Sequence, residues 1–304
     1  MEDSTVVIYT THTYNSNVEF FMTNGIFKSD KVYFIIVLNM ADENEIYSHI
    51  NNLSNVTVIV RENEGPDFEA WNYALNMVKS ISFNKYIFIN SSCRGPFVFE
   101  NDNWTELFTS QLNDEVKLVG PSINYSKDNG FHVQSFAFAT DGVGLQLLKN
   151  NQIFGDNVTY SLNNEIKMSV IILKNNYKLQ SLIKIPFNII ENDIWVKGGL
   201  DTFIDIHEAI FVKNGGDMML DCLKLCHDIK YQYINHNLKA IYGGVDVTKK
   251  LYKVMNGPLV KLKGNYNDIF GDTKYGEVKH LEISSNAGKW TMKENEEINL
   301  NVIY

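Results

Sequence analysis

The chain has 304 residues, of which 44% are hydrophobic and 21% are charged, with only 5 Pro. This length corresponds to one large or two ordinary domains, and the composition excludes disordered, collagen-like and low-complexity proteins. The formal net charge is -9, and Arg61 and Arg94 are the only arginines, which argues against a cationic surface for binding nucleic acid.

Short strands and helices alternate through residues 1–120. Runs rich in β-branched and aromatic residues predict strands at residues 5–10, 31–39, 55–61, 85–90 and 116–120. Helical spacing predicts helices at residues 17–27, 43–52, 67–80 and 104–112. Because the strands are continuous apolar runs, the pattern predicts an α/β fold with a doubly wound, mostly parallel sheet and helices on both faces.

The second half of the chain is less regular. We predict strands at residues 131–140 and 208–213 and helices at residues 141–150, 160–175 and 216–233. From residue 237 onward, short alternating segments and turn pairs such as Gly243-Gly244 are typical of a small antiparallel β domain. We therefore predict two domains, residues 1–236 and 237–304, and expect the small one to lean on the first domain or on a partner, as in a homo-oligomer.

Polar residues follow the predicted strands. In a parallel sheet, ligands bind beyond the carboxyl ends of the strands, where loops and helix starts converge. The strand exits here are Thr10-Thr11-His12, Asn39-Met40-Ala41-Asp42, residues 61–67 and residues 90–96. No Walker loop, dinucleotide-binding glycine motif, nucleophile elbow or His-Glu-x-x-His helix is present, which removes several large enzyme classes.

Several motifs occur in a fixed order. They are Arg61-x-Asn63-x-Gly65-x-Asp67, Asn90-Ser91-Ser92-x-Arg94-Gly95-Pro96, Val119-Gly120-Pro121-Ser122, His132-Val133-Gln134, Asp205-Ile206-His207-Glu208 and Phe211-Val212-Lys213. Together they resemble glycosyltransferases of the GT-A fold, a Rossmann-like fold. The closest resemblance is to a group related to rhamnan-synthesis proteins, with relatives in plants, bacteria and large DNA viruses. It covers residues 5–215.

The resemblance implies an enzyme of glycan biosynthesis. Such an enzyme transfers a hexose or deoxyhexose from a nucleotide-diphosphate sugar, for example a UDP sugar, to a hydroxyl of a glycan or protein-linked acceptor. The residues that it implies as donor contacts are Thr10, Asn63, Asp67, Asn90, Ser92, Arg94, His132 and Lys213. A nucleotidyltransferase shares this kind of sheet, but it needs a glycine-rich loop where this chain has Thr10-Thr11-His12-Thr13-Tyr14.

One motif departs from the family. The family usually has Asp-x-Asp after the fourth strand, where it holds Mn²⁺ or Mg²⁺, and this chain has Asn90-Ser91-Ser92. Neutral oxygens are poorer anchors for such a cation. Three options follow: a metal held partly by His207 or Asp205, a metal-free enzyme that uses Arg94 and Lys213, or a protein that has lost catalysis. We favour the metal-assisted enzyme, with His207 and Asn90 as ligands. The alternative is a catalytically silent glycan-binding or structural protein of a virion or surface assembly.

Asp141 and Glu165 are the candidate catalytic residues, as base or acceptor contact. Each has a structural alternative, because Asp is a good helix N-cap and Glu is favoured in a first helical turn. Asp67 is likewise either a ligand contact or a cap. His132 and Gln134 share one face of the predicted strand and either line an acceptor site or are structural.

Cellular location and the last domain are predicted more coarsely. No segment has the length of a signal peptide core or membrane span, and Cys93, Cys222 and Cys226 show no pairing pattern. We expect a soluble protein of the cytoplasm, or of the host cytoplasm or virion if it is viral. The motif at residues 240–248 resembles the small C-terminal β domain of some J-domain co-chaperones, which brings no known chemistry. We expect a packing or oligomerisation module, and the alternative is a glycan-binding role.

Overall fold

The computed structural model describes residues 4–39, 50, 53–81, 83–98, 103–126, 130–154, 161–183, 210–213, 237–256 and 259–301. They fall into two compact units, which consist mainly of residues 4–213 and 237–301, and each unit is described by itself. The predicted domain boundary near residue 236 lies outside the described residues and stays a prediction. The same holds for the predicted helix at residues 216–233 and for nearly all of the one at 43–52.

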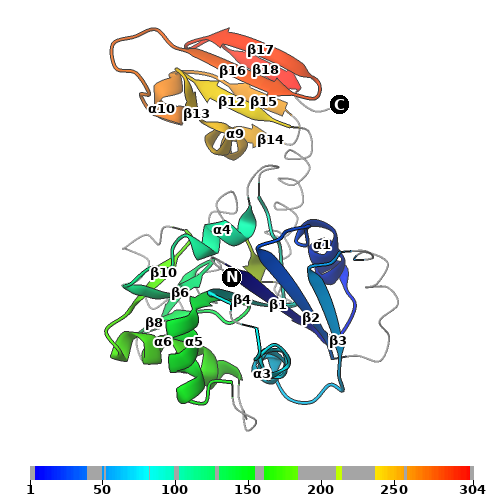
Figure 1. Cartoon of the computed structure of the whole chain (residues 1–304). Coiled ribbons are helices and arrows are strands. Elements are labelled where there is room, and N and C mark those ends of the chain that lie inside the picture. Colours follow the sequence, from blue (N-terminus) through cyan, green and yellow to red (C-terminus); the bar gives the residue numbers. More distant parts are fainter. Residues whose placement is uncertain are drawn as a thin grey trace. The chain divides into compact units, whose positions relative to one another are not determined.

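A seven-stranded sheet forms the centre of the first unit (Figure 1). Its strands are β1 (Thr5–Thr11), β2 (Val32–Leu38), β3 (Val56–Val60), β4 (Lys85–Asn90), β6 (Val116–Gly120), β9 (Ala137–Asp141) and β10 (Lys178–Ser181). Their order in the sheet is β10-β6-β9-β4-β1-β2-β3. All neighbours are parallel except β9, which is antiparallel to β4 and β6. The predicted α/β fold with a mostly parallel sheet is confirmed.

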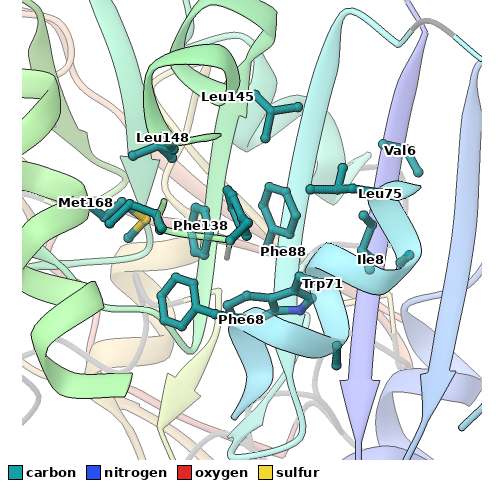
Figure 2. Packing of buried hydrophobic residues seen from close by; sticks show 14 of the residues in the cluster. Val6, Ile8, Phe68, Trp71, Leu75, Phe88, Phe138, Leu145, Leu148 and Met168 are labelled. Carbon is teal, nitrogen blue, oxygen red and sulfur yellow. The ribbon is translucent and has the colours of Figure 1, made fainter. Parts of the chain in front are cut away.

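Helices cover both faces of this sheet. On one face, α3 (Asp67–Met77), α5 (Gly142–Asn150) and α6 (Ser161–Lys174) contribute to one buried cluster, in which Trp71 lies beside Phe88 and Ile8 (Figure 2). On the other face, Tyr9 stacks on Phe21 of α1 (Ser16–Asn24) with a ring separation of 4.2 Å. Ile8 and Tyr9 are neighbours in β1 and therefore point to opposite faces. Phe21 also contacts Trp104 of α4 (Trp104–Thr109).

The strand register brings the polar strand exits to one edge. Thr10 pairs with Asn90 across β1 and β4, and Thr11 pairs with Leu38 at the end of β2. We call the edge where β1, β2, β3 and β4 end the carboxyl edge. Because β9 runs the other way, it begins near this edge, and its last residue, Asp141, pairs with the first residue of β4.

The prediction of one strand over residues 131–140 is wrong. β8 (Gly130–Val133) pairs with β7 (Ile123–Ser126) in a separate two-stranded sheet, and β9 begins only at Ala137. Between these two strands, Gln134 is 3% exposed and Phe136 is 2% exposed. Because this turn is buried, its residue types do not distinguish it from a strand in the sequence. β7 and the edge strand β10 were not predicted, since both are short and rich in polar residues.

The second unit is a small antiparallel β structure, as predicted. One sheet has the order β13-β12-β16-β17 and the other β14-β15-β18. The elements are β12 (Lys239–Tyr242), β13 (Val245–Asp246), α9 (Thr248–Val254), β14 (Met255–Asn256), β15 (Leu259–Leu262), α10 (Tyr266–Phe270), β16 (His280–Ser285), β17 (Gly288–Lys293) and β18 (Ile298–Asn301). The unit has its own buried cluster, which includes Tyr242, Leu251 and Phe270.

Candidate functional site

Three side chains at the carboxyl edge form a hydrogen-bonded chain. Asn90, the last residue of β4, donates from Nδ2 to Oδ2 of Asp67 at 2.7 Å. Its Oδ1 accepts from the backbone N–H of Ser92 at 3.1 Å and from the Ser92 hydroxyl at 2.5 Å. Two residues that the sequence nominated as donor contacts, Asp67 and Ser92, are therefore each hydrogen-bonded to a third, Asn90.

Asp67 does not act as a helix cap. Pro66 occupies the N-cap position of α3, and no side-chain cap hydrogen bond is present there. Burial raises the pKa of the Asp67 carboxyl above its ordinary value, whereas the hydrogen bond from Asn90 and the charges of His12 and Lys213 act to lower that pKa. The cap interpretation of Asp67 is therefore wrong, and its role as a ligand contact stays a prediction.

Lys213 reaches this region through a short ladder. β5 (Cys93–Arg94) pairs antiparallel with β11 (Val212–Lys213), so that Lys213 lies opposite Cys93. The approach depends on Gly95, which has a φ of 153° and where an added Cβ would lie 2.5 Å from the carbonyl oxygen of Ile210. The ladder and the loop after β1 place Lys213 and His12 close enough to Asp67 for their charges to act on its carboxylate.

Arg94 lies in β5, two residues after Ser92, but α1 holds its side chain. The guanidinium donates from Nη1 to the backbone carbonyl of Ser16 at 2.8 Å. It also lies over the ring of Phe20, 4.4 Å from the ring centre, in a cation–π contact. The same guanidinium would have to give up these two interactions with α1 to move toward a phosphate group.

Glu165 also reaches the carboxyl edge. Its Oε2 accepts from the backbone N–H and from the hydroxyl of Ser135, both at 2.7 Å. The next residue, Phe136, accepts from the backbone N–H of Asn90 at 3.0 Å. Glu165 is 5% exposed and lies beyond the first turn of α6, so the interpretation as a solvated first-turn residue is wrong.

Asp141 lies at the opposite edge of the sheet. Its Oδ1 accepts from the backbone N–H of Gly144 at 2.9 Å and caps α5, and its Oδ2 is 2.6 Å from Nζ of Lys117. The cap interpretation is therefore the one that fits, and the structure does not bring Asp141 together with Asp67 and Asn90. The prediction of Asp141 as a catalytic residue has no support from this position.

The other nominated residues have different surroundings. Thr10 is fully buried and accepts from the Asn39 side chain at 3.4 Å, whereas Asn63 is exposed. His132 is fully buried in β8, where its Nδ1 lies 3.2 Å from the carbonyl oxygen of Gly130. His207 and Asp205 lie outside the described residues.

Sequence reasoning missed a group of buried polar atoms near the carboxyl edge. Four of them have no hydrogen-bond partner in the described part of the chain: the Tyr9 hydroxyl, Oδ1 of Asn17, Oδ1 of Asn39 and Nη1 of Arg61. Asn17 is tied to the edge because its Nδ2 donates to the Ser91 carbonyl at 3.2 Å. The polar strand exits were the available signal for Asn39 and Arg61, but burial cannot be seen in a sequence. Unsatisfied buried polar atoms are costly unless a ligand or water binds them.

The described residues do not fit a divalent cation at Asn90. The Asn90 carbonyl oxygen has two lone pairs, and both are used by the N–H and hydroxyl of Ser92. The described ranges contain no group of three or more His, Cys, Asp or Glu side chains that could hold a metal ion. These hydrogen bonds argue against Asn90 as a metal ligand. Asn90 and His207 both stay predictions.

No model of a protein family matches the chain, and no curated protein matches it. A similar solved structure is S. aureus TarS 1-349, with 16% identity and a TM-score of 0.40 over 59% of this chain and 58% of that one. Another is the glycosyltransferase GlyE of Streptococcus pneumoniae TIGR4, with 9% identity and a TM-score of 0.43 over 77% of this chain and 62% of that one.

A third is 4-diphosphocytidyl-2C-methyl-D-erythritol synthase from Anaerococcus prevotii DSM 20548. It has 11% identity and a TM-score of 0.36 over 64% of this chain and 96% of that one. None of these scores is high enough to assign a function, so the function proposed below rests on this chain's own residues. No helix in the described part of the chain is long and apolar enough to cross a membrane.

Proposed function

We propose that this protein is a glycosyltransferase that binds a nucleotide-diphosphate sugar at the carboxyl edge and transfers the sugar to an acceptor hydroxyl. The observation that carries the proposal is the hydrogen-bonded chain of Asp67, Asn90 and Ser92, with His12 and Lys213 beside it. The motif series that resembles GT-A glycosyltransferases passes through the same residues.

The residue types suit such a donor. A leaving diphosphate carries at least two negative charges and needs positively charged or N–H groups near it. Lys213 and His12 are groups of this kind, and the exposed Ser92 presents a hydroxyl. The unsatisfied atoms of Tyr9 and Asn39 suit the hydroxyl and amide groups of a nucleoside.

Glu165 is the residue proposed to receive the proton. The acceptor oxygen attacks the anomeric carbon, the bond from that carbon to the terminal phosphate oxygen breaks, and the nucleoside diphosphate leaves. The proton of the acceptor hydroxyl passes to the Glu165 carboxylate, which Ser135 orients through Oε2. The second oxygen, Oε1, makes no hydrogen bond with the described residues and is the atom proposed to take the proton.

A catalytically silent glycan-binding protein is the second candidate. The observation that favours it is that an amide, Asn90, stands where the family usually has a carboxylate, and that this amide is fully hydrogen-bonded within the chain. Such a protein would keep the fold and bind a sugar without turnover.

Isothermal titration with UDP, GDP, CDP, ADP and TDP tests the donor site. We expect one of them to bind with a Kd below about 1 mM. The matching sugar nucleotides are then incubated with the protein, because a transferase transfers some sugar to water. Release of the diphosphate supports the enzyme, and binding without release supports the silent protein. Failure of all five to bind would remove the donor-site proposal.

A further inference from the structure

We infer that the pyrophosphate of the donor is held without a divalent cation, by the side chains of Lys213 and His12 beside the Asp67–Asn90 pair. This inference rests on the proposed function and concerns the chemistry of the same site. It selects the metal-free option among the three that the Asn90-Ser91-Ser92 motif left open. It also replaces Arg94 by His12 as the partner of Lys213.

The first argument is the orientation of the Asn90 amide. Its NH₂ group faces a carboxylate oxygen of Asp67, and its carbonyl oxygen faces the backbone N–H of Ser92. A rotation of the amide by half a turn would bring oxygen against oxygen and nitrogen against N–H, so this orientation is the only one that both neighbours accept. The carbonyl oxygen also accepts the Ser92 hydroxyl. A cation could bind there only after displacing one of these two hydrogen bonds.

The second argument is the shortage of carboxylates around Asn90 among the residues that the structure describes. A divalent cation such as Mg²⁺ or Mn²⁺ is held mainly by carboxylate oxygens in addition to the phosphates. Asp67 is the carboxylate in contact with Asn90, and one of its oxygens is already hydrogen-bonded. Within the described ranges, Asp67 does not belong to any group of three or more His, Cys, Asp or Glu side chains that could hold a metal ion.

The third argument is that positive and N–H groups are present instead. Lys213 is fixed by the β5–β11 ladder, opposite Cys93, and therefore close to the chain position of Ser92. His12 is exposed in the loop after β1. β1 and β4 end at the same edge of the sheet, because Thr10 pairs with Asn90. A lysine ammonium is a compact charge that commonly binds phosphate, and the imidazole offers a second N–H. By contrast, α1 already holds the guanidinium of Arg94.

The test compares nucleotide binding with and without metal. The nucleoside diphosphate that binds most tightly is titrated into the wild-type protein in EDTA and again in Mn²⁺. The expected Kd is the same in both within about threefold, and Lys213→Ala and His12→Ala each weaken binding about tenfold in both buffers. Lys213→Gln keeps much of the apolar stem, so it removes the charge with less risk of unfolding the protein. Lys174→Ala is the control, because it removes an exposed lysine of α6.

The variant Asn90→Asp tests whether a second carboxylate at this position creates a cation site that the wild-type protein lacks. This variant places two carboxylates at the 2.7 Å contact that Asn90 and Asp67 now share, which is an arrangement that a cation stabilises. We expect Mn²⁺ to tighten nucleotide binding about tenfold in Asn90→Asp and not in the wild type. The loss of the free Mn²⁺ signal in electron paramagnetic resonance gives a readout that is independent of nucleotide binding.

The outcomes separate the two proposals. If the wild-type protein binds a nucleoside diphosphate only in Mn²⁺, or about tenfold more tightly there, the cation-free inference is overturned and the glycosyltransferase proposal stands. If no nucleoside diphosphate binds in either buffer, both fail together. If binding is indifferent to Mn²⁺ but unchanged in both Lys213→Gln and His12→Ala, the assignment of these two side chains is overturned.

Discussion

Asp67 and Asp141 stand at the starts of two helices on opposite edges of the same sheet. Asp141 caps α5 with one carboxylate oxygen and contacts the ammonium of the buried Lys117 with the other. Asp67 makes no cap bond, and it accepts a hydrogen bond from the neutral side chain of Asn90, with His12 and Lys213 nearby. The two residues have the same chemistry and a similar place in the sequence pattern. Asp141 stabilises the fold through a helix cap and an ion pair, and Asp67 makes neither interaction.

The comparison teaches how to separate structural from functional carboxylates in this fold. A carboxylate whose oxygens are both used by a helix N-terminus and a buried lysine contributes to stability and has little capacity left for a ligand. A half-buried carboxylate that lacks an ion pair is a burden to the fold at neutral pH, because burial disfavours its charged form. Such residues cluster at binding sites.

The largest expected effect is on stability, in Asp141→Ala. Removal of the carboxylate leaves Lys117, whose side chain is 6% exposed, as a buried charge, and it removes the cap of α5. We expect the free energy of unfolding to fall by about 3 kcal/mol, with nucleotide affinity unchanged. Urea denaturation measures the change, and Asp141→Asn, which retains an acceptor for the cap, should lose less. A folded Asp141→Ala protein of normal stability that no longer binds nucleotide would contradict the division between the two edges.

Glu165→Gln should have the largest effect on the proposed reaction. The amide keeps an acceptor for Ser135 but cannot take a proton, so we expect the transfer rate to fall about 100-fold with KM nearly unchanged. Steady-state kinetics with the identified donor measures both constants. Ser135→Ala is the control, because it removes one of the two hydrogen bonds and keeps the carboxylate. A large rise in KM with kcat unchanged would make Glu165 a binding residue.

Asp67→Ala should show the opposite pattern to Asp141→Ala, namely a loss of affinity with little loss of stability. We expect the affinity for the sugar nucleotide to fall about tenfold, with the free energy of unfolding changed by less than about 1 kcal/mol. Calorimetric titration and urea denaturation of the same samples give the two numbers. A loss of stability as large as that of Asp141→Ala, with affinity intact, would show that Asp67 is structural.

The smallest expected effect is a pH dependence. The pKa of Asp67 is raised in the folded protein, so its protonation favours folding, and this contribution is lost as the pH rises from the unfolded pKa through the folded pKa. Asp67→Asn, which is always neutral, should therefore gain stability relative to the wild type as the pH rises from the ordinary carboxyl value of 3.8 toward neutrality. Urea denaturation across this range tests the sign. A relative loss of stability with rising pH would mean that Asp67 is stabilised as a carboxylate.

Local sequence was sufficient for much of the frame that carries the site. β4 and β6 have the predicted bounds, Lys85–Asn90 and Val116–Gly120, and α3 begins at Asp67 as predicted. These limits are encoded by neighbouring residues: apolar runs give the strands, and helical spacing gives the helix. The rule that parallel strands end at one edge placed the exits at residues 61–67 and 90–96 together, and the contact between Asp67 and Asn90 became visible only in the structure.

The remaining features depend on residues that are distant in the sequence. The direction of β9 decides that Asp141 lies away from Asn90, and strand direction is a property of the assembled sheet. The pairing of Lys213 with Cys93 and the contact of Glu165 with Ser135 bring residues from separate segments together. The sequence by itself therefore determined most strands of the parallel sheet and the polar residues at their ends, because these depend on local periodicity, but it missed β7 and β10. Only the tertiary structure decided which carboxylates are paired, capped or left for a ligand, because burial and partners arise when the chain packs.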